Sequence, residues 1–289
     1  AFDHLVSTSH FGAQQLSQLI GREVPYVHHG VNLNTFKPLS DSRLEPCPLQ
    51  QLFDEEVGAW DDHFVVLGIG RNVSRKALPT LLEIYAAALA DCPKMRLILM
   101  TNPKDPFGAS LIEVASRLGV LSKLGFIVTL PVRSEEVSFV GDDELNVIYN
   151  RAALTAVPSL GEGFGLHVLE SMAAGTPVLA ADNSALSELI ADGRGAAMPC
   201  YGSAWVPSSS MRLRPVDVEQ ARAQLVSLYQ DWESGGARLR TMREKGLAFA
   251  RERSWRVTAE RLNPATVVRK DLPVTGGALS PTVEQIVSL

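Results

Sequence analysis

Cysteine is scarce in this chain, and the cysteines present show no metal-binding or disulfide spacing. Only three occur among 289 residues, at Cys47, Cys92 and Cys200. An odd number of distant thiols without a CxxC pair argues against a zinc site and against a disulfide framework. We therefore expect reduced thiols and a cytoplasmic protein.

Long apolar runs and an excess of positive charge are also missing. No apolar run approaches the roughly 20 residues that cross a bilayer, and the N-terminal sequence AFDHLVSTSHFG lacks the basic and apolar regions of a signal peptide. A net charge of −5 at pH 7 argues against nucleic acid as the main partner. The basic stretch 236–256 lacks a bulky apolar stripe, so the sequence offers no support for membrane contact.

The composition is that of an ordinary globular protein, with 46% hydrophobic and 20% charged residues. From residue 63, strand-like apolar runs alternate with helical patterns. The expected strands are 63–70, 95–100, 123–130, 153–157 and 178–181, and the expected helices are 79–89, 109–118, 144–150, 185–191, 217–231 and 237–261. This alternation predicts an α/β fold, a parallel sheet with helices on both faces.

The first part of the chain predicts too little structure to fold by itself. Residues 2–8 read as a strand, Ser9 as the N-cap of a helix near 10–20, and residues 37–60 as an irregular connector. A single strand and helix cannot bury themselves. We therefore expect this part to belong to a preceding domain, in a chain that is a piece of a longer protein.

The strongest functional signal is the sequence PSLGEGFGLHVLESMAAGTP at residues 158–177. Glu162 and Glu170 flank a glycine turn that opens a helix, and Gly175 ends that helix. The unpaired first amides and the dipole of a helix attract anions, whereas carboxylates suit hydroxyl groups. A nucleotide-sugar carries both kinds of group. The alternative is one loop acid and one solvated helix acid.

A second signal follows the expected strand 63–70, in the loop GRNVSRK at residues 70–76. Its three cations lie just before a helix, where each opposes the helix dipole by about 0.3–1 kcal/mol. Ligands of parallel sheets bind at the carboxyl ends of strands, so an anion between the cations would reverse this cost. Arg71 would grip a phosphate bidentately and Lys76 would supply a point charge. A solvated basic loop is the equal alternative.

Two glycines in this loop suggest a dinucleotide-binding fingerprint, but the pattern is incomplete. Gly68 and Gly70 are present, whereas Val73 occupies the position of the third glycine. An NAD-dependent oxidoreductase is therefore disfavoured.

From Asp3 to about Leu262, the ordered motifs resemble the latter part of a retaining GT-B glycosyltransferase of the glycosyl transferases group 1 family. VHHGVNLNTFKP is similar to the hinge motif of that family, with Asn32 at its usual aspartate position. GRNVSRK is similar to its phosphate loop, EGFGLHVLE to its glutamate pair, and the sequence around Trp255 to the start of its last helix. Glu188 matches a further helix acid of the family.

The resemblance implies a role for each matching residue. Arg71 and Lys76 would hold the donor diphosphate, and Glu162 would orient the donor sugar. Glu170 would bind the ribose hydroxyls. The remaining donor-binding residues would be Gly163, Phe164, Gly165, Leu166 and His167. For His167, a polar sugar contact and a tolerated variant are both open.

The implied reaction is transfer of a hexosyl group from a UDP- or GDP-sugar with retained configuration, without a cofactor or metal ion. The acceptor is not specified. The implied domains are the end of an acceptor-side domain with the hinge (1–36), a Rossmann-like donor-binding domain (37–262) and a tail (263–289). Because the acceptor-side domain would lie before residue 1, a non-catalytic nucleotide-sugar-binding module is an alternative. A phosphorylase or epimerase on the same scaffold is disfavoured, because such phosphorylases usually carry a pyridoxal lysine in a longer chain.

Overall fold

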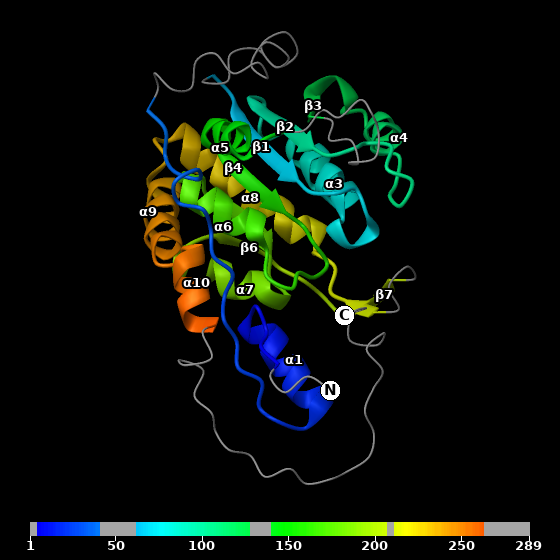
Figure 1. Cartoon of the computed structure of the whole chain (residues 1–289). Helices are drawn as coiled ribbons and strands as arrows, with labels where there is room; N and C mark the ends of the chain where they lie inside the picture. The colour runs from blue at the N-terminus through cyan, green and yellow to red at the C-terminus, as the bar shows by residue number, and fades with distance from the viewer. Residues whose placement is uncertain (1–4, 41–61, 128–139, 207–210, 263–289) are drawn as a thin grey trace, which may run out of the picture.

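A parallel β-sheet organises the chain in the computed structural model, which describes residues 5–40, 62–127, 140–206 and 211–262 (Figure 1). The sheet has six strands in the order β3-β2-β1-β4-β5-β6, and every pairing between neighbours is parallel. In chain order the strands are β1 Phe64–Ile69, β2 Met95–Met100, β3 Leu124–Ile127, β4 Leu154–Val157, β5 Val178–Ala181 and β6 Ala196–Met198. The predicted α/β fold is confirmed.

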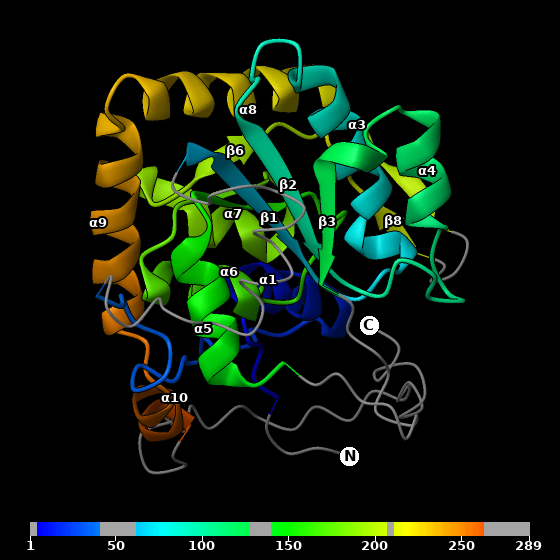
Figure 2. The same ribbon diagram turned by 90° about the horizontal axis from the view of Figure 1, so that it is seen from above.

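Helices cover both faces of this sheet, as the view from above shows (Figure 2). The helices are α1 His10–Ile20, α3 Leu78–Ala88, α4 Leu111–Arg117, α5 Asp142–Arg151, α6 Leu166–Ala174, α7 Ser184–Ile190, α8 Val218–Glu233, α9 Ala237–Arg251 and α10 Trp255–Leu262. Helix α8 packs on α3, and α9 packs on α6. No helix in the described part of the chain is both long and apolar enough to cross a membrane.

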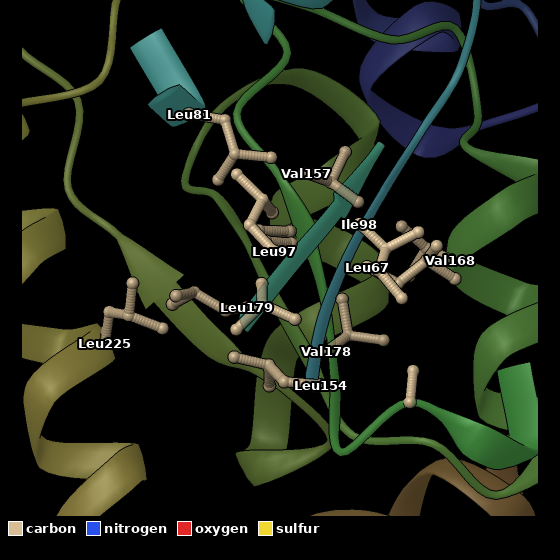
Figure 3. Close-up of a cluster of buried hydrophobic side chains, with 14 of the residues drawn as sticks. Leu67, Leu81, Leu97, Ile98, Leu154, Val157, Val168, Val178, Leu179 and Leu225 are labelled. Atoms are coloured by element: carbon tan, nitrogen blue, oxygen red, sulfur yellow. The ribbon is translucent and has the colours of Figure 1, made fainter. Parts of the chain in front are cut away.

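The core lies on both sides of the central strands (Figure 3). Leu67 and Ile98 lie beside Val168 of α6, whereas Leu97 lies on the side of Leu81 of α3. Gly68 belongs to this second side. A Cβ atom there would lie 2.7 Å from Leu81 Cδ2, so the glycine lets α3 pack closely on β1. Burial from both faces explains why the strands read as continuous apolar runs.

Three short strands were absent from the sequence prediction. They are β6 and the antiparallel hairpin of β7 (Ala204–Val206) with β8 (Met211–Leu213), and each has three residues. Runs this short carry too little alternation to be distinguished from loops. Of the strand expected at 2–8, the described residues 5–8 form only an isolated bridge, between Ser7 and Tyr26. Residues 2–4 of that prediction, most of the connector 37–60, residues 128–130 and the tail 263–289 lie outside the described residues.

The single helix predicted at 237–261 is wrong, because the chain breaks it between α9 and α10. The hinge segment explains the break. Val31 N–H donates to Arg253 O at 2.8 Å, and Val31 pairs with Ser254 in a parallel bridge. The local sequence contributes as well, because Val257 N–H donates to Ser254 Oγ at 3.3 Å, which makes Ser254 the N-cap of α10.

Candidate functional site

The two sequence signals meet at the carboxyl edge of the sheet, where β1 and β4 are neighbours. The chain proceeds from β1 outward to β2 and β3, then returns to β4 and continues outward to β5 and β6. The loops after β1 and β4 therefore diverge at the point where doubly wound sheets bind ligands. Leu160 N–H donates to Arg75 O at 2.9 Å and ties the two loops together.

Glu162 is the centre of this junction. Its Oε1 lies 2.6 Å from Lys76 Nζ and accepts from Ser159 Oγ at 2.8 Å, while its Oε2 lies 2.6 Å from Arg75 Nη1. Burial alone would raise the pKa of this carboxyl, but the positive charge of Lys76 leads the influences that outweigh it and hold the pKa at about 2. Glu162 is therefore ionised. Arg75 is one of the three cations of this loop, but it is not among the site residues that the sequence predicts.

Arg71, the other predicted phosphate ligand, lies on the opposite side of this loop. Its Nε donates to Asp105 Oδ2 at 2.8 Å, and its guanidinium carbon lies 5.0 Å from the centre of the Phe107 ring. The Lys76 side chain packs on Gly70 instead, where an added Cβ atom would lie 3.3 Å from Lys76 Cε. The structure thus brings Lys76 to Glu162 and brings Arg71 to the loop after β2.

The predicted helix start is α6, which opens at Gly165. This glycine has φ 105°, and a Cβ atom on it would lie 3.1 Å from Leu186 Cδ2. Both facts require glycine here. The first turn begins when Val168 N–H donates to Gly165 O at 3.0 Å, so the amides of Leu166 and His167 precede the helical bonds. Such amides suit an anion.

His167 presents an unpaired nitrogen beside the same junction. Its Nε2 is buried and has no hydrogen-bond partner within the described ranges. Burial, followed by the charge of Lys76, lowers the pKa of this imidazole to about 3. The ring is therefore neutral at physiological pH and supplies a hydrogen bond rather than a charge.

Glu170 lies on α6, one turn of the helix beyond Leu166. Tyr149 Oη, on α5, donates to Glu170 Oε2 at 3.1 Å, so the carboxylate is held through one of its oxygens. Burial raises the pKa of Glu170 above its ordinary value, and Asp142 adds to the effect. A carboxylate that already accepts from a hydroxyl can accept another at Oε1.

Phe164 and Gly163 face the N-terminal segment. The Phe164 side chain is buried, and its ring centre lies 5.4 Å from that of His28 and 5.2 Å from that of His29. Thr8 Oγ1 donates to Gly163 O at 3.3 Å. This half of the glycine turn therefore packs on the segment that precedes the sheet.

Glu188 joins the same segment to α7. Its carboxylate accepts from the amides of His10 and Phe11 at 3.0 and 2.6 Å and pairs with His28 Nε2 at 3.0 Å. It thus caps the start of α1, where a negative charge is favourable. Helix α1 lies beside α7 (Figure 1). Nothing in the local sequence predicts this partner.

Metal-ligating side chains do not gather at this edge. The ranges that the structure describes contain no group of three or more His, Cys, Asp and Glu residues that could hold a metal ion.

The sequence of the sheet domain matches a known family. Residues 63–230 match the family model described as glycosyl transferases group 1. The chain belongs to that family, as its sequence motifs indicated.

Curated relatives cover about two thirds of the chain. The D-inositol 3-phosphate glycosyltransferase of Streptosporangium roseum is 33% identical over 201 residues, which are 66% of this chain and 42% of that protein. The enzyme of the same name from Nocardioides sp. is 34% identical over 204 residues, covering 67% of this chain and 42% of that protein. The matched part is thus less than half of these relatives.

Solved structures agree on the fold. HepE of Anabaena, solved with UDP and glucose, has a TM-score of 0.68 at 20% identity and covers 89% of this chain and 61% of its own. Sucrose-phosphate synthase of Thermosynechococcus elongatus has a TM-score of 0.67 at 22% identity, covering 90% and 57%. The C-terminal domain of LpcC from Francisella tularensis has a TM-score of 0.53 at 20% identity, covering 77% and 97%. The fold is therefore GT-B-like.

Proposed function

We propose that this chain is the donor-binding half of a retaining, metal-independent glycosyltransferase that uses a UDP- or GDP-sugar. The observation that carries the proposal is the junction of Lys76, Glu162 and the free amides of α6 at the switch point of the sheet. The loops after β1 and β4 and the start of α6 offer a cation, anion-binding amides and carboxylates for hydroxyl groups.

In this proposal the two cations hold the diphosphate. Arg71 and Lys76 stabilise the negative charge that grows on the nucleoside diphosphate as the glycosidic bond to its phosphate breaks. The amides of Leu166 and His167 bind the same phosphates. Glu162 fixes Lys76 and borders the sugar, and Glu170 offers Oε1 to the ribose hydroxyls.

The transfer itself needs no covalent nucleophile from this chain. The acceptor hydroxyl attacks the anomeric carbon on the face that the diphosphate leaves, and the departing phosphate takes the proton of that hydroxyl. The two bonds change on one face, so configuration is retained. The positive charge that develops on the sugar ring lies beside Glu162.

The domain division is part of the proposal. Residues 1–36 end an acceptor-side domain, 37–262 bind the donor, and 263–289 form a tail. The alignment with less than half of the curated relatives, and with nearly all of the C-terminal domain of LpcC, supports a donor-binding half. A cytoplasmic location and reduced thiols remain our expectation, and Cys92 and Cys200 are both free.

The decisive experiment measures donor turnover and binding together. Full-length protein is incubated with a panel of UDP- and GDP-sugars and acceptors, and release of nucleoside diphosphate is followed. Binding of UDP, GDP and the bare nucleosides is measured by calorimetry. We expect one donor to be turned over, and absence of binding to every nucleotide would overturn the proposal.

Variants at two positions separate the proposed roles. Lys76→Ala is expected to weaken the diphosphate about tenfold or more while leaving the nucleoside unchanged, because it loses a charged contact. Glu170→Ala is expected to weaken nucleoside and diphosphate alike. Equal losses for both ligands in Lys76→Ala would remove Lys76 from the phosphate site.

The alternative is a non-catalytic nucleotide-sugar-binding module. It predicts donor binding of the same pattern, with no release of nucleoside diphosphate under any acceptor.

A further inference from the structure

The loop after β2 grips the cation loop after β1. Asn72 Nδ2 donates to Ala109 O at 2.7 Å. A Cβ atom on Gly108 would lie 2.2 Å from Asn72 O, so the two backbones approach as closely as glycine allows. The loop that carries Asp105 and Phe107 is therefore held against the loop that carries Arg71.

Asp105 binds Arg71 through one edge only. The two bonds run from Arg71 Nε to Oδ2 at 2.8 Å and from Nη2 to Oδ1 at 3.5 Å. A guanidinium has five N–H donors in a rigid plane, and Nη1 takes part in neither bond. The opposite edge of the guanidinium is therefore turned away from Asp105.

The carboxylate of Asp105 is itself held in place. Phe107 N–H donates to its Oδ1 at 2.9 Å, and the side chain is 8% exposed, against 60% for Arg71. The hydrogen bond to Arg71 lowers the pKa of Asp105, so the pair is charged at neutral pH. The guanidinium carbon of Arg71 lies over the Phe107 ring, and that side chain is 70% exposed.

This arrangement holds the guanidinium by one edge and leaves its Nη1 unbound by Asp105. The loop after β1 thus carries two cations with separate carboxylate partners: Arg71 pairs with Asp105 of the loop after β2, and Lys76 pairs with Glu162 of the loop after β4. If Asp105 were absent and the guanidinium paired with Glu162 instead, fewer of its N–H donors would remain for the diphosphate.

We propose that Asp105 and Phe107 are positioning residues that hold the guanidinium of Arg71 with its Nη1 edge open to the diphosphate of the donor. This inference rests on the proposed function. Asp105 fixes the direction of the planar group, and Phe107 fixes its tilt. Neither residue touches the donor.

The test measures diphosphate binding separately from nucleoside binding. Calorimetric dissociation constants for UDP and GDP, and for uridine and guanosine, are compared in full-length wild type, Asp105→Ala, Phe107→Ala and Phe107→Tyr. We expect Asp105→Ala to weaken the diphosphate about tenfold with no change for the nucleoside, the order of loss for a charged hydrogen bond. Phe107→Ala should weaken it several-fold, and Phe107→Tyr should restore it.

Two further variants exclude a purely structural effect. Asp91→Asn removes the carboxylate partner of Arg222, in a pair that joins α8 to the turn after α3, and should change neither constant. In an Arg71→Ala background, adding Asp105→Ala should have no further effect, because the two residues act as one unit. Phe107 is exposed, so its variants test the inference even if Asp105→Ala folds poorly.

Several results would overturn the inference. Equal losses for nucleoside and diphosphate would make Asp105 a structural residue. Tighter diphosphate binding in Asp105→Ala would make it a competitor for Arg71. Loss of binding in Lys76→Ala with no change in either Asp105→Ala or Phe107→Ala would overturn this inference alone, whereas absence of nucleotide binding by wild type would overturn the proposed function with it.

Discussion

Glu162 shows at the scale of one residue how a buried charge is made tolerable. Its carboxylate has two cations and a hydroxyl within hydrogen-bond distance and is 8% exposed. Removing one member of such a group leaves charges buried without a partner, which costs more than the group contributes. The site is therefore sensitive to loss of this carboxylate even without a ligand.

We expect Glu162→Ala to lower the free energy of unfolding by roughly 3–5 kcal/mol, because Lys76 and Arg75 would then face each other without a counter-charge. Chemical denaturation measures it. Glu219→Ala, which removes an exposed partner of Arg222, is the control and should cost less than about 1 kcal/mol. Similar small losses in both variants would show that the carboxylate is dispensable to the fold.

His167 gives the protein a predictable response to acid. Its pKa is about 3 in the folded protein and about 6.5 when unfolded, so the unfolded chain takes up a proton that the folded chain refuses. Stability falls as the pH drops below about 6.5 and continues to fall until about 3. Glu162, with a pKa of about 2, loses its contribution only below about pH 4.5.

His167→Leu should therefore flatten the fall in stability between pH 7 and pH 5, by roughly 1–2 kcal/mol at pH 5 relative to wild type. Urea denaturation at a series of pH values measures this. Parallel profiles for the two proteins would mean that the imidazole is protonated normally in the folded state.

Residue types predicted much of the site, and geometry decided the rest. The sequence predicted both the glycine turn between two glutamates and the loop rich in cations. The pairing of Arg75 with Glu162 and of Arg71 with Asp105 was not, because adjacent cations of one loop point in directions that only the tertiary contacts determine. The anchoring of α1 by Glu188 depends on residues about 180 positions apart in sequence, as its separations of 178 and 177 show.

At the scale of elements, the hinge segment is the best test of close packing. A Cβ atom on Gly30 would lie 2.3 Å from the backbone nitrogen of Trp255, at the start of α10. Backbone cannot move aside as a flexible side chain does. The glycine is what permits the hinge to lie against this helix.

We expect Gly30→Ala to destabilise the protein by about 1–3 kcal/mol, the cost of overpacking a fitted contact. Thermal unfolding measures it. Gly163→Ala serves as the control, since nothing lies within 4 Å of its added Cβ atom. Equal melting temperatures of Gly30→Ala and wild type would contradict the close approach.

The elements that were predicted correctly are those with a strong period or a long apolar run. Strands such as β1 and helices such as α3 are buried on one side or both, and burial leaves a mark in the sequence. Strand β6 and the β7–β8 hairpin are too short to leave a recognisable pattern in the sequence. The break before α10 combines a local signal, the N-cap Ser254, with the pairing of Val31 from far away in the chain.

At the scale of the whole molecule, the segment 5–36 is joined to the sheet domain by long-range polar contacts as well as by the packing of Val31 and Phe36 in the core. Glu188 holds α1, Thr258 Oγ1 donates to His28 O at 3.0 Å, and Val31 pairs with Ser254. Long-range contacts of this kind open more readily than a core.

Glu188→Ala should therefore expose α1 to limited proteolysis at least several-fold faster, while the main thermal transition of the sheet domain stays nearly unchanged. Glu219→Ala again provides an exposed control. Cleavage of both variants at the wild-type rate would show that other contacts hold α1.

The pairing of Val31 with Ser254 also sets an order of events during synthesis. A ribosome adds about 5–20 residues per second, so the interval between making Val31 and making Arg253 is roughly 10–40 s. For that time the hinge has no Trp255 to rest against and no carbonyl of Arg253 to bind. The piece of the chain that is made early is thus among the last to reach its place.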